Sequence, residues 1–372
     1  MLILRKLNQC TWIKDKEKKM KKEKMKNVKN VVGVVAVILV LVLLLPAFTE
    51  TAPAWQPPEK LLIGSGGTKT SNYATCVALG SGITDATGIQ VFVKPSATTL
   101  GRVSFIHDKI TPFTSVTAAG FYLAIAGKFE FEKWGPQKIR VVWNGTTIPQ
   151  GVLTRGNSGI KTWADVKGKR VPQYVGYPMV QMYIDSALSY GNVSQNDVTQ
   201  VPVGGYAPAI QGVINGTVDV APAATTSGAA RELEASVYGI HWLPMPSANT
   251  EAWARFRKVC PALHPHKGTI GAGMSAANPA EVWGNNLIFT AYDYQDEQLV
   301  YWLVKQVHQS FDLYKGKHSQ LKNWTIDQCL DLEQMWAPFH PGSIKYFKEI
   351  GRWTDEHEKL QQSLLKKWGQ KK

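Results

Sequence analysis

The chain has 372 residues and a formal net charge of +14. Eleven Lys and Arg side chains lie between Arg5 and Lys29, and residues 1–54 hold four acidic ones, so residues 55–372 carry a net charge of only +7. This moderate charge is weak support for nucleic-acid binding, and we expect most of these lysines to form a solvated surface. Residues 55–372 exceed the size at which one hydrophobic core usually stops growing, so two lobes are expected.

An uncharged run from Val31 to Leu45 follows the basic segment and precedes a proline and small residues. This order is typical of a secretory signal, with candidate cleavage sites at Ala52–Ala54 and at Ala47. The run is short for the roughly 20 residues of a membrane span, and an uncleaved anchor stays open as an alternative. We therefore predict a signal peptide over residues 1–54 and a periplasmic location, with a membrane tether if the signal is not cleaved.

The basic leader is unusually long, and Met20 and Met25 each begin a more ordinary signal. This favours a true start downstream of Met1. Cys10 lies in the leader before the apolar run, so no lipid anchor is implied. Cys76, Cys260 and Cys329 allow at most one disulfide bond, whose connectivity the sequence leaves open.

The first elements of residues 55–150 predict a β-α-β unit built around a glycine-rich turn. A strand at 61–63 leads into the turn Gly64–Thr68, a helix covers 71–84, and an alternating strand covers 89–93. Backbone N–H groups at such a turn and at the next helix N-terminus favour an anion. A helix at 98–107 and a strand at 110–116 follow. Serine and threonine end these strands, at the edge where open parallel sheets bind ligands.

The pattern then predicts a crossing into a second lobe over residues 151–242. Strands at 139–143 and 151–154 are separated by an expected turn at Asn144–Gly145. Thr162 and Asp165 resemble a capping box, and Pro178 suits the first turn of a helix that runs to residue 190. The later elements expected in this lobe are a helix at 205–215 and strands at 218–221 and 240–243. The chain is then expected to return to the first lobe over 243–372, with a strand at 287–292 and mostly helices from 295 to about 368.

Catalytic and metal motifs are weak or missing in this sequence. The glycine turn does not fit a dinucleotide-binding fingerprint, because that motif needs glycine at position 69, which is Lys69. It does not fit a Walker loop either, because that motif needs glycine immediately before the lysine, where this chain has Thr68. Cys260, His264 and His266 have spacing that could hold a transition metal, but two flanking prolines favour a surface loop. We predict no enzyme activity, no cofactor and no metal.

Three blocks of the sequence resemble the TAXI type of solute-binding subunit from tripartite ATP-independent periplasmic (TRAP) transporters. They are the strand and glycine-threonine loop at 63–68, the segment 158–171, which is similar to the pattern SGIKSLADLKGKRV, and the helix-to-strand step at 211–220. The resemblance covers residues 61–372. It implies an α/β periplasmic binding protein-like fold, with two lobes that each have a central β-sheet flanked by helices, and a hinge between them.

The resemblance also implies a small anionic solute, such as an organic acid, glutamate or 2-oxoglutarate, and membrane permease subunits as partners, with no nucleic acid. Aromatic residues near the proposed turns are expected to wall the cleft. The full set of expected ligand-binding residues is Gly66, Gly67, Thr68, Tyr73, Ser96, Thr98, Ser115, Trp143, Gly176, Tyr177, Pro178, Tyr206 and Thr226. Arg155 and Arg170 either hold charge near this cleft or lie on a lobe surface.

Three other functions share this architecture and stay open at the level of sequence. An ATP-driven (ABC-type) importer uses a binding subunit of the same shape. An exported enzyme would need a perturbed acid or nucleophile in the cleft. A sensor module would need an uncleaved leader and a membrane partner.

Overall fold

The computed structural model describes residues 16–30, 32–33, 55–68 and 70–369. The chain divides into two units, one before residue 57 and one from Pro57 to Lys372. Residues 16–30 are helical. The apolar run from residue 34 onward and both candidate cleavage sites lie outside the described residues. Within the described residues, no helix is long and apolar enough to cross a membrane.

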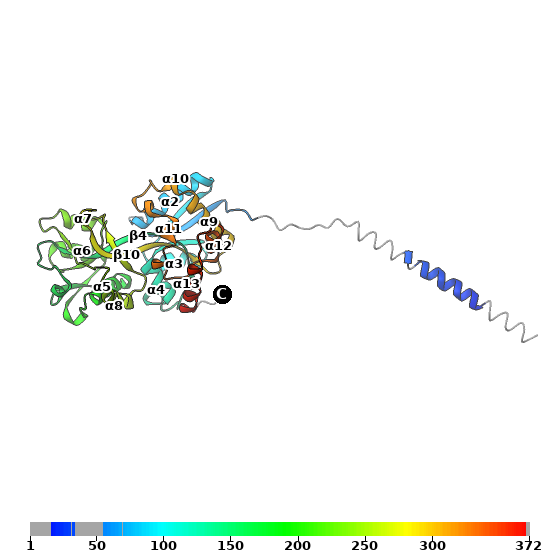
Figure 1. Cartoon of the computed structure of the whole chain (residues 1–372), viewed down its shortest axis with the longest axis horizontal. Coiled ribbons are helices and arrows are strands. Elements are labelled where there is room, and N and C mark those ends of the chain that lie inside the picture. The colour runs from blue at the N-terminus through cyan, green and yellow to red at the C-terminus, as the bar shows by residue number, and fades with distance from the viewer. Residues whose placement is uncertain (1–15, 31, 34–54, 69, 370–372) are drawn as a thin grey trace, which may run out of the picture. The chain divides into compact units, whose positions relative to one another are not determined.

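The unit from Pro57 to Lys372 has two α/β regions (Figure 1). The first region begins with three parallel strands, each followed by a helix. The sequence predicts the three strands and the first two helices, but not the third helix. The pairs are β1 (Lys60–Ser65) with α2 (Ser71–Thr87), β2 (Gln90–Pro95) with α3 (Thr99–His107), and β3 (Phe113–Thr117) with α4 (Ala118–Ala126). Gly88, in the left-handed conformation at φ 75°, ends α2.

Two long antiparallel strands, β4 (Ile139–Arg155) and β10 (Ala280–Tyr292), connect the regions. The strand order in the large sheet is β2-β1-β3-β10-β4-β7. The predicted turn at Asn144–Gly145 is wrong, because both residues lie inside β4. The Asn144 side chain accepts a hydrogen bond from Asn286 on β10 at 2.9 Å, and the Trp324 ring packs on the bare backbone of Gly145. Strand pairing and packing therefore outweigh the local turn signal.

The second region contains a separate parallel pair of strands and four helices (Figure 1). The strands are β5 (Arg170–Tyr174) and β6 (Thr199–Val203), and the helices are α5 (Pro178–Tyr190), α6 (Tyr206–Asn215), α7 (Gly228–Ala235) and α8 (Thr250–Val259). The capping box of Thr162 and Asp165 is present. The strand expected at 218–221 begins three residues further along the chain, as β7 (Ala221–Ala224), which pairs with β4. Asp219 lies outside this strand, because its backbone N–H donates to the carbonyl of Arg170 on β5.

The chain returns to the first region later than the predicted position of 243. Helix α8 packs on α5, and Arg255 on α8 donates to the backbone oxygen of Ser189 at 3.1 Å. Short strands β8 (Ile240–Trp242) and β9 (His264–Gly268) pair with β4 and β10. The chain re-enters the first region along β10. The remaining elements are α9 (Glu297–Gln309), α10 (Phe311–Tyr314), α11 (Ile326–Cys329), α12 (Pro341–Glu349) and α13 (Asp355–Lys367).

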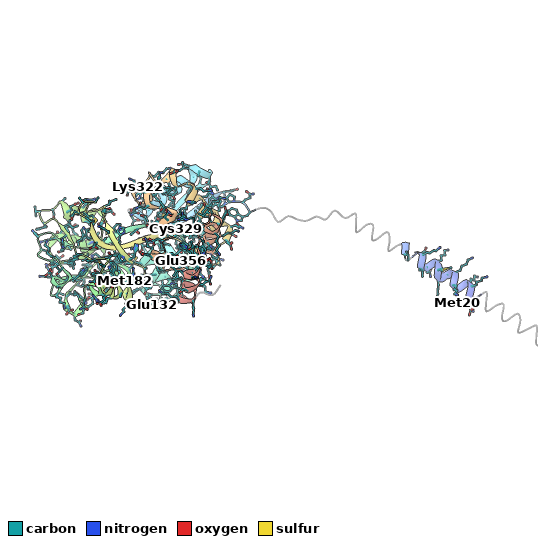
Figure 2. The ribbon with its side chains drawn as sticks, viewed as in Figure 1. Met20, Glu132, Met182, Lys322, Cys329 and Glu356 are labelled. Atoms are coloured by element: carbon teal, nitrogen blue, oxygen red, sulfur yellow. The ribbon has the colours of Figure 1, made fainter. Side chains whose placement is uncertain are left out.

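Figure 2 shows the side chains of both regions. The largest fully buried side chains are all aromatic. Cys76, Cys260 and Cys329 are buried free thiols, so no disulfide joins any two of these three. The sequence was compatible with three free thiols, but it was equally compatible with one disulfide bond. With a sheet and flanking helices in each region and two strands joining them, the predicted α/β periplasmic binding protein-like fold is confirmed.

Candidate functional site

Three helix N-termini meet at the carboxyl edge of the parallel strands in the first region. Each begins with a threonine whose side-chain oxygen accepts from a backbone N–H in the first turn, namely Thr70 for α2, Thr98 for α3 and Thr117 for α4. None of these helices carries an acidic residue in its first turn. Since carboxylates are usually enriched there, this edge has a positive potential that is not offset locally.

The glycine-rich loop lies against the turn that precedes α3. The backbone N–H of Ser96 donates to the carbonyl of Ser65 at 2.9 Å. A Cβ on Gly66 would lie 2.6 Å from Thr70 Oγ1, so only glycine fits the close approach at this position. Gly67 contacts Ala97. Of the predicted residues, Gly66, Gly67, Ser96 and Thr98 are therefore brought together.

Ser115 is buried below this loop, and its hydroxyl has an internal partner. The side-chain oxygen of Asn72 accepts hydrogen bonds from Ser65 Oγ and Ser115 Oγ, each at 2.9 Å. This arrangement fixes the start of α2 against β1 and β3. Thr68 is exposed and Tyr73 is half-buried on the first turn of α2.

A second group of predicted residues lies at the ends of β5 and β6. Gly176 has φ 80°, which suits glycine at the turn before Pro178. The Tyr177 ring is half exposed and packs beside Gly205, the residue that precedes Tyr206. The N-termini of α5 and α6 have no side-chain cap and no acidic residue in the first turn. Pro178 has no N–H group, and no N-cap side chain accepts from the remaining first-turn N–H groups of either helix.

Met179, next to the predicted Pro178, connects the two groups. Its sulfur accepts hydrogen bonds from Thr99 Oγ1 on α3 at 3.7 Å and from Thr117 Oγ1 before α4 at 3.8 Å. The first turn of α5 therefore lies on the first turns of α3 and α4. The turn at Gly176–Pro178 therefore adjoins the first region at α3 and α4.

Two predicted residues lie apart from this contact. Trp143 is fully buried in the core, where its ring packs at 6.2 Å from the Phe347 ring on α12. Thr226 is exposed after β7, while its neighbour Thr225 is buried and donates to the Ile270 carbonyl. The sequence places Trp143 at the cleft because it is an aromatic residue next to a proposed turn. That signal does not distinguish a core ring from one that lines a cleft.

Sequence reasoning missed Arg102, which is the buried charge nearest this contact. Only 7% of its surface is exposed, and its Nη2 donates to Thr99 Oγ1 at 2.9 Å. Its Nη1 lies 3.4 Å from the position of a Cβ on Gly66. Burial lowers the pKa of the guanidinium. The available signal was a basic residue in the first turn of a helix, where the helix dipole disfavours it.

A buried polar network continues from α5 to the connecting strands. Asn285 on β10 donates to the Tyr183 hydroxyl at 2.8 Å and to Gln150 on β4 at 3.0 Å. The backbone N–H of Ala119, at the start of α4, donates to the same asparagine at 3.3 Å. Asn285 thereby joins both regions and both connecting strands at one point.

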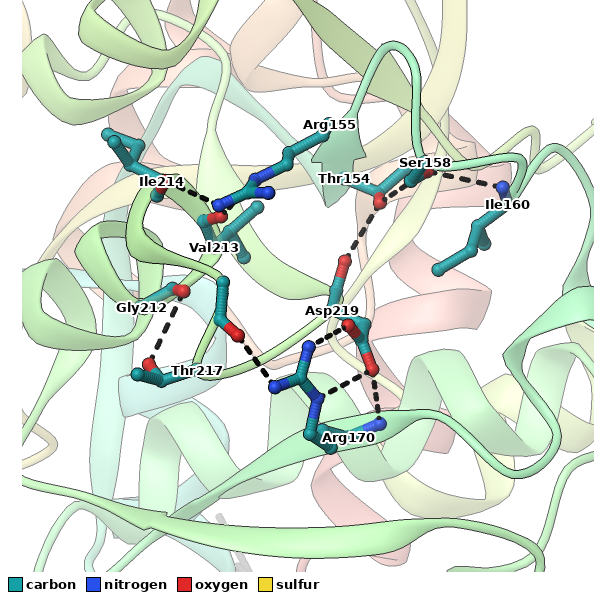
Figure 3. Close-up of polar contacts among 11 residues, drawn as sticks. Thr154, Arg155, Ser158, Ile160, Arg170, Gly212, Val213, Ile214, Thr217 and Asp219 are labelled. Carbon is teal, nitrogen blue, oxygen red and sulfur yellow. Dashed lines mark hydrogen bonds and ion pairs between the residues drawn. The ribbon is translucent and has the colours of Figure 1, made fainter. Parts of the chain in front are cut away.

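The arginines near the predicted crossing have structural partners (Figure 3). Arg170 forms an ion pair with Asp219 and also donates to the Gly216 carbonyl. Arg155 donates to the carbonyls of Val213 and Ile214 at the end of α6, and stacks on a tyrosine ring. They line a surface hollow of about 260 Å³, none of whose lining residues belongs to the predicted set. These contacts favour the lobe-surface interpretation over a charge in the cleft.

The histidine cluster is part of a strand rather than a loop. His264 lies on β9 and interacts with Gln334 at 3.1 Å, and burial lowers its pKa to about 4. His266 is on the same strand. Among the described residues, no group of three or more His, Cys, Asp or Glu side chains is placed to hold a metal ion.

A family model described as the NMT1-like family matches residues 63–351. No curated protein sequence gives a significant match. Among solved structures, the chain is similar to the periplasmic aliphatic sulphonate-binding protein SsuA from Escherichia coli, with 14% identity, 83% of each chain covered and a TM-score of 0.45. It is also similar to MatC from Rhodopseudomonas palustris with bound malate, with 13% identity, 82% of this chain and 98% of that chain covered, and a TM-score of 0.47.

Proposed function

Because the chain belongs to the NMT1-like family, we propose that it is an extracytoplasmic solute-binding protein that captures a small anionic solute between its two regions. The solute is an organic acid or amino acid, with glutamate and 2-oxoglutarate as candidates. The protein delivers it to the membrane permease of a TRAP transporter as a TAXI-type subunit.

The contact of Met179 with Thr99 and Thr117 carries this proposal. It brings the N-termini of α3, α4 and α5 together, and the loop before α2 adjoins them where Gly66 approaches Arg102. None of these four helices has an acidic residue in its first turn. Such N-termini bind carboxylates, sulfonates and phosphates through their free N–H groups. Because the N-termini belong to both regions, a bound anion stabilises the state in which the regions touch.

A thermal-shift and calorimetry panel tests the proposal on the exported chain. The probes are glutamate, 2-oxoglutarate, malate, adipate and ethanesulfonate. We expect at least one to raise the melting temperature, since a ligand at about 100 times its Kd adds about 2.7 kcal/mol to the free energy of unfolding. Mass spectrometry of the released compound should show it chemically unchanged. No response to any of these probes would contradict the proposal, and turnover would favour an exported enzyme.

Two variants locate the binding event. Ser96→Ala and Tyr177→Ala should each weaken the response to the probe that binds. Ser363→Ala, an exposed serine on α13, is the matched control and should leave it unchanged. A neighbouring gene for a fused multi-span permease without an ATPase would support the TRAP partner, whereas an adjacent ATPase gene would favour an ABC importer.

A further inference from the structure

Arg102 is a buried cation without a carboxylate partner. It forms no ion pair within the described part of the chain, and its Nε has no hydrogen-bond partner there. Glu130 attracts it only at longer range, and has a buried oxygen of its own without a partner. Buried arginines are normally paired, because removing the charge from water has a large cost in free energy.

The position of Arg102 makes this cost larger. It lies in the first turn of α3, at the positive end of the helix dipole, and next to the N-terminus of α2 through Gly66. A bound anion would offset the guanidinium charge and the helix dipoles at the same time. Arginine also suits this task geometrically, because its planar donors match the two oxygens of a carboxylate or a sulfonate.

The second region holds three tyrosines with buried hydroxyls near one another, and one of them, Tyr183, lies close to Arg102. The hydroxyls of Tyr174 and Tyr206 are buried without a hydrogen-bond partner in the described structure. Burial raises the pKa of Tyr206, and the nearby Tyr183 and Tyr174 raise it further. Both hydroxyls therefore keep their protons and can donate. Tyr183, on the same face of α5 as Met179, lies close enough to Arg102 to affect its pKa.

We propose that Arg102 anchors the solute, whose carboxylate or sulfonate it binds, while Tyr174 and Tyr206 donate to an acceptor oxygen at the other end. The ligand class is thus a small organic acid with one anionic group and a second, oxygen-bearing end. This inference rests on the proposed solute-binding function. It adds two things to that function: the residue that supplies the positive charge, and the orientation in which the solute is bound.

Calorimetry with the same five probes tests the anchor. Arg102→Met should lower the affinity for the best probe at least about 30-fold, because the anion loses a buried charge partner. Arg102→Lys should recover only part of that loss, since lysine lacks the planar fork. Tyr206→Phe should lower the affinity about threefold to tenfold, as expected for one hydrogen bond. Arg231→Met, a half-exposed arginine paired with Glu234 on α7, is the control and should bind as the wild type does.

The ligand-free melting temperature separates anchoring from a structural role. If Arg102 has no carboxylate partner until the solute arrives, Arg102→Met should melt at the same temperature as the wild type or higher. A solute-binding wild type whose Arg102→Met variant binds equally well would overturn the anchor and leave the proposed function intact. A lower ligand-free melting temperature would also overturn it, because the arginine would then stabilise the empty fold. A wild type that binds none of the probes would overturn both.

Discussion

Thr99 on α3 and Met179 on α5 are joined by a hydrogen bond from the threonine hydroxyl to the methionine sulfur, over 3.7 Å. The same hydroxyl accepts from Arg102 at 2.9 Å. One threonine therefore connects the buried cation of the first region to the first turn of a helix in the second. Introducing a charge at Met179 should therefore affect both the contact of the regions and the environment of Arg102.

Met179→Lys should open the two regions. The new ammonium group would lie near the Arg102 guanidinium, and juxtaposed like charges cost several kcal/mol when partly buried. Small-angle X-ray scattering of the ligand-free chain should give a larger radius of gyration than the wild type, and solute affinity should fall at least about tenfold. Met179→Leu conserves volume and is the control. Identical scattering from the lysine variant would contradict the role assigned to this contact.

Gly145→Ala should destabilise the fold. A Cβ at this position would lie 2.4 Å from the Trp324 ring, which also packs against Phe289. Overpacking of this kind lowers the free energy of unfolding by about 1–3 kcal/mol. Urea denaturation measures the loss. Gly316→Ala provides the comparison, because nothing lies within 4 Å of the added methyl group. Equal midpoints for the two variants would mean that Trp324 does not pack on Gly145.

His340→Asn should reduce the loss of stability in acid. His340 is 1% exposed and caps α12 by accepting from the Gly342 N–H, and burial, with the nearby Arg140, lowers its pKa to about 4. The unfolded value is about 6.5. The neutral folded form is therefore favoured above pH 6.5, and the stability it contributes is lost as the pH falls from about 6.5 toward 4.

This linkage lowers the free energy of unfolding by up to about 1.4 kcal/mol per pH unit for one histidine within that window. Asparagine can keep the helix cap but does not titrate. Denaturant titrations at pH 7, 5.5 and 4.5 should therefore give a shallower pH dependence for the variant. If the free energy of unfolding depends on pH in the same way for the variant and the wild type, His340 does not contribute to the loss of stability in acid.

The thiols of Cys76, Cys260 and Cys329 should be inert in the folded chain. All three are fully buried, and burial raises the pKa of Cys76 to about 11 and that of Cys260 to about 12. The thiolate is the reactive form, so alkylation at pH 8 should be slow without denaturant and complete with it. Peptide mapping after iodoacetamide treatment reads each site separately. A mapped disulfide between any two of them would contradict the structure.

Local signals in the sequence predicted much of the fold. The glycine loop before α2, the capping box at Thr162 and the proline that begins α5 each depend on a few neighbouring residues. Their preferences follow from backbone geometry and side-chain hydrogen bonds within one turn. This is why α2, α3, α5 and α6 were found close to their observed bounds.

The sequence by itself determined the α/β class and the order of the elements from β1 through β3. Only the tertiary structure decided that Asn144–Gly145 continues a strand, that Trp143 belongs to the core, and that Arg102 is buried beside Thr99. Turns and caps depend on adjacent residues, whereas burial and the lack of a charge partner depend on elements far apart in the chain. Those long-range relations bring Thr99 between Arg102 and Met179 of α5, and no local pattern encodes them.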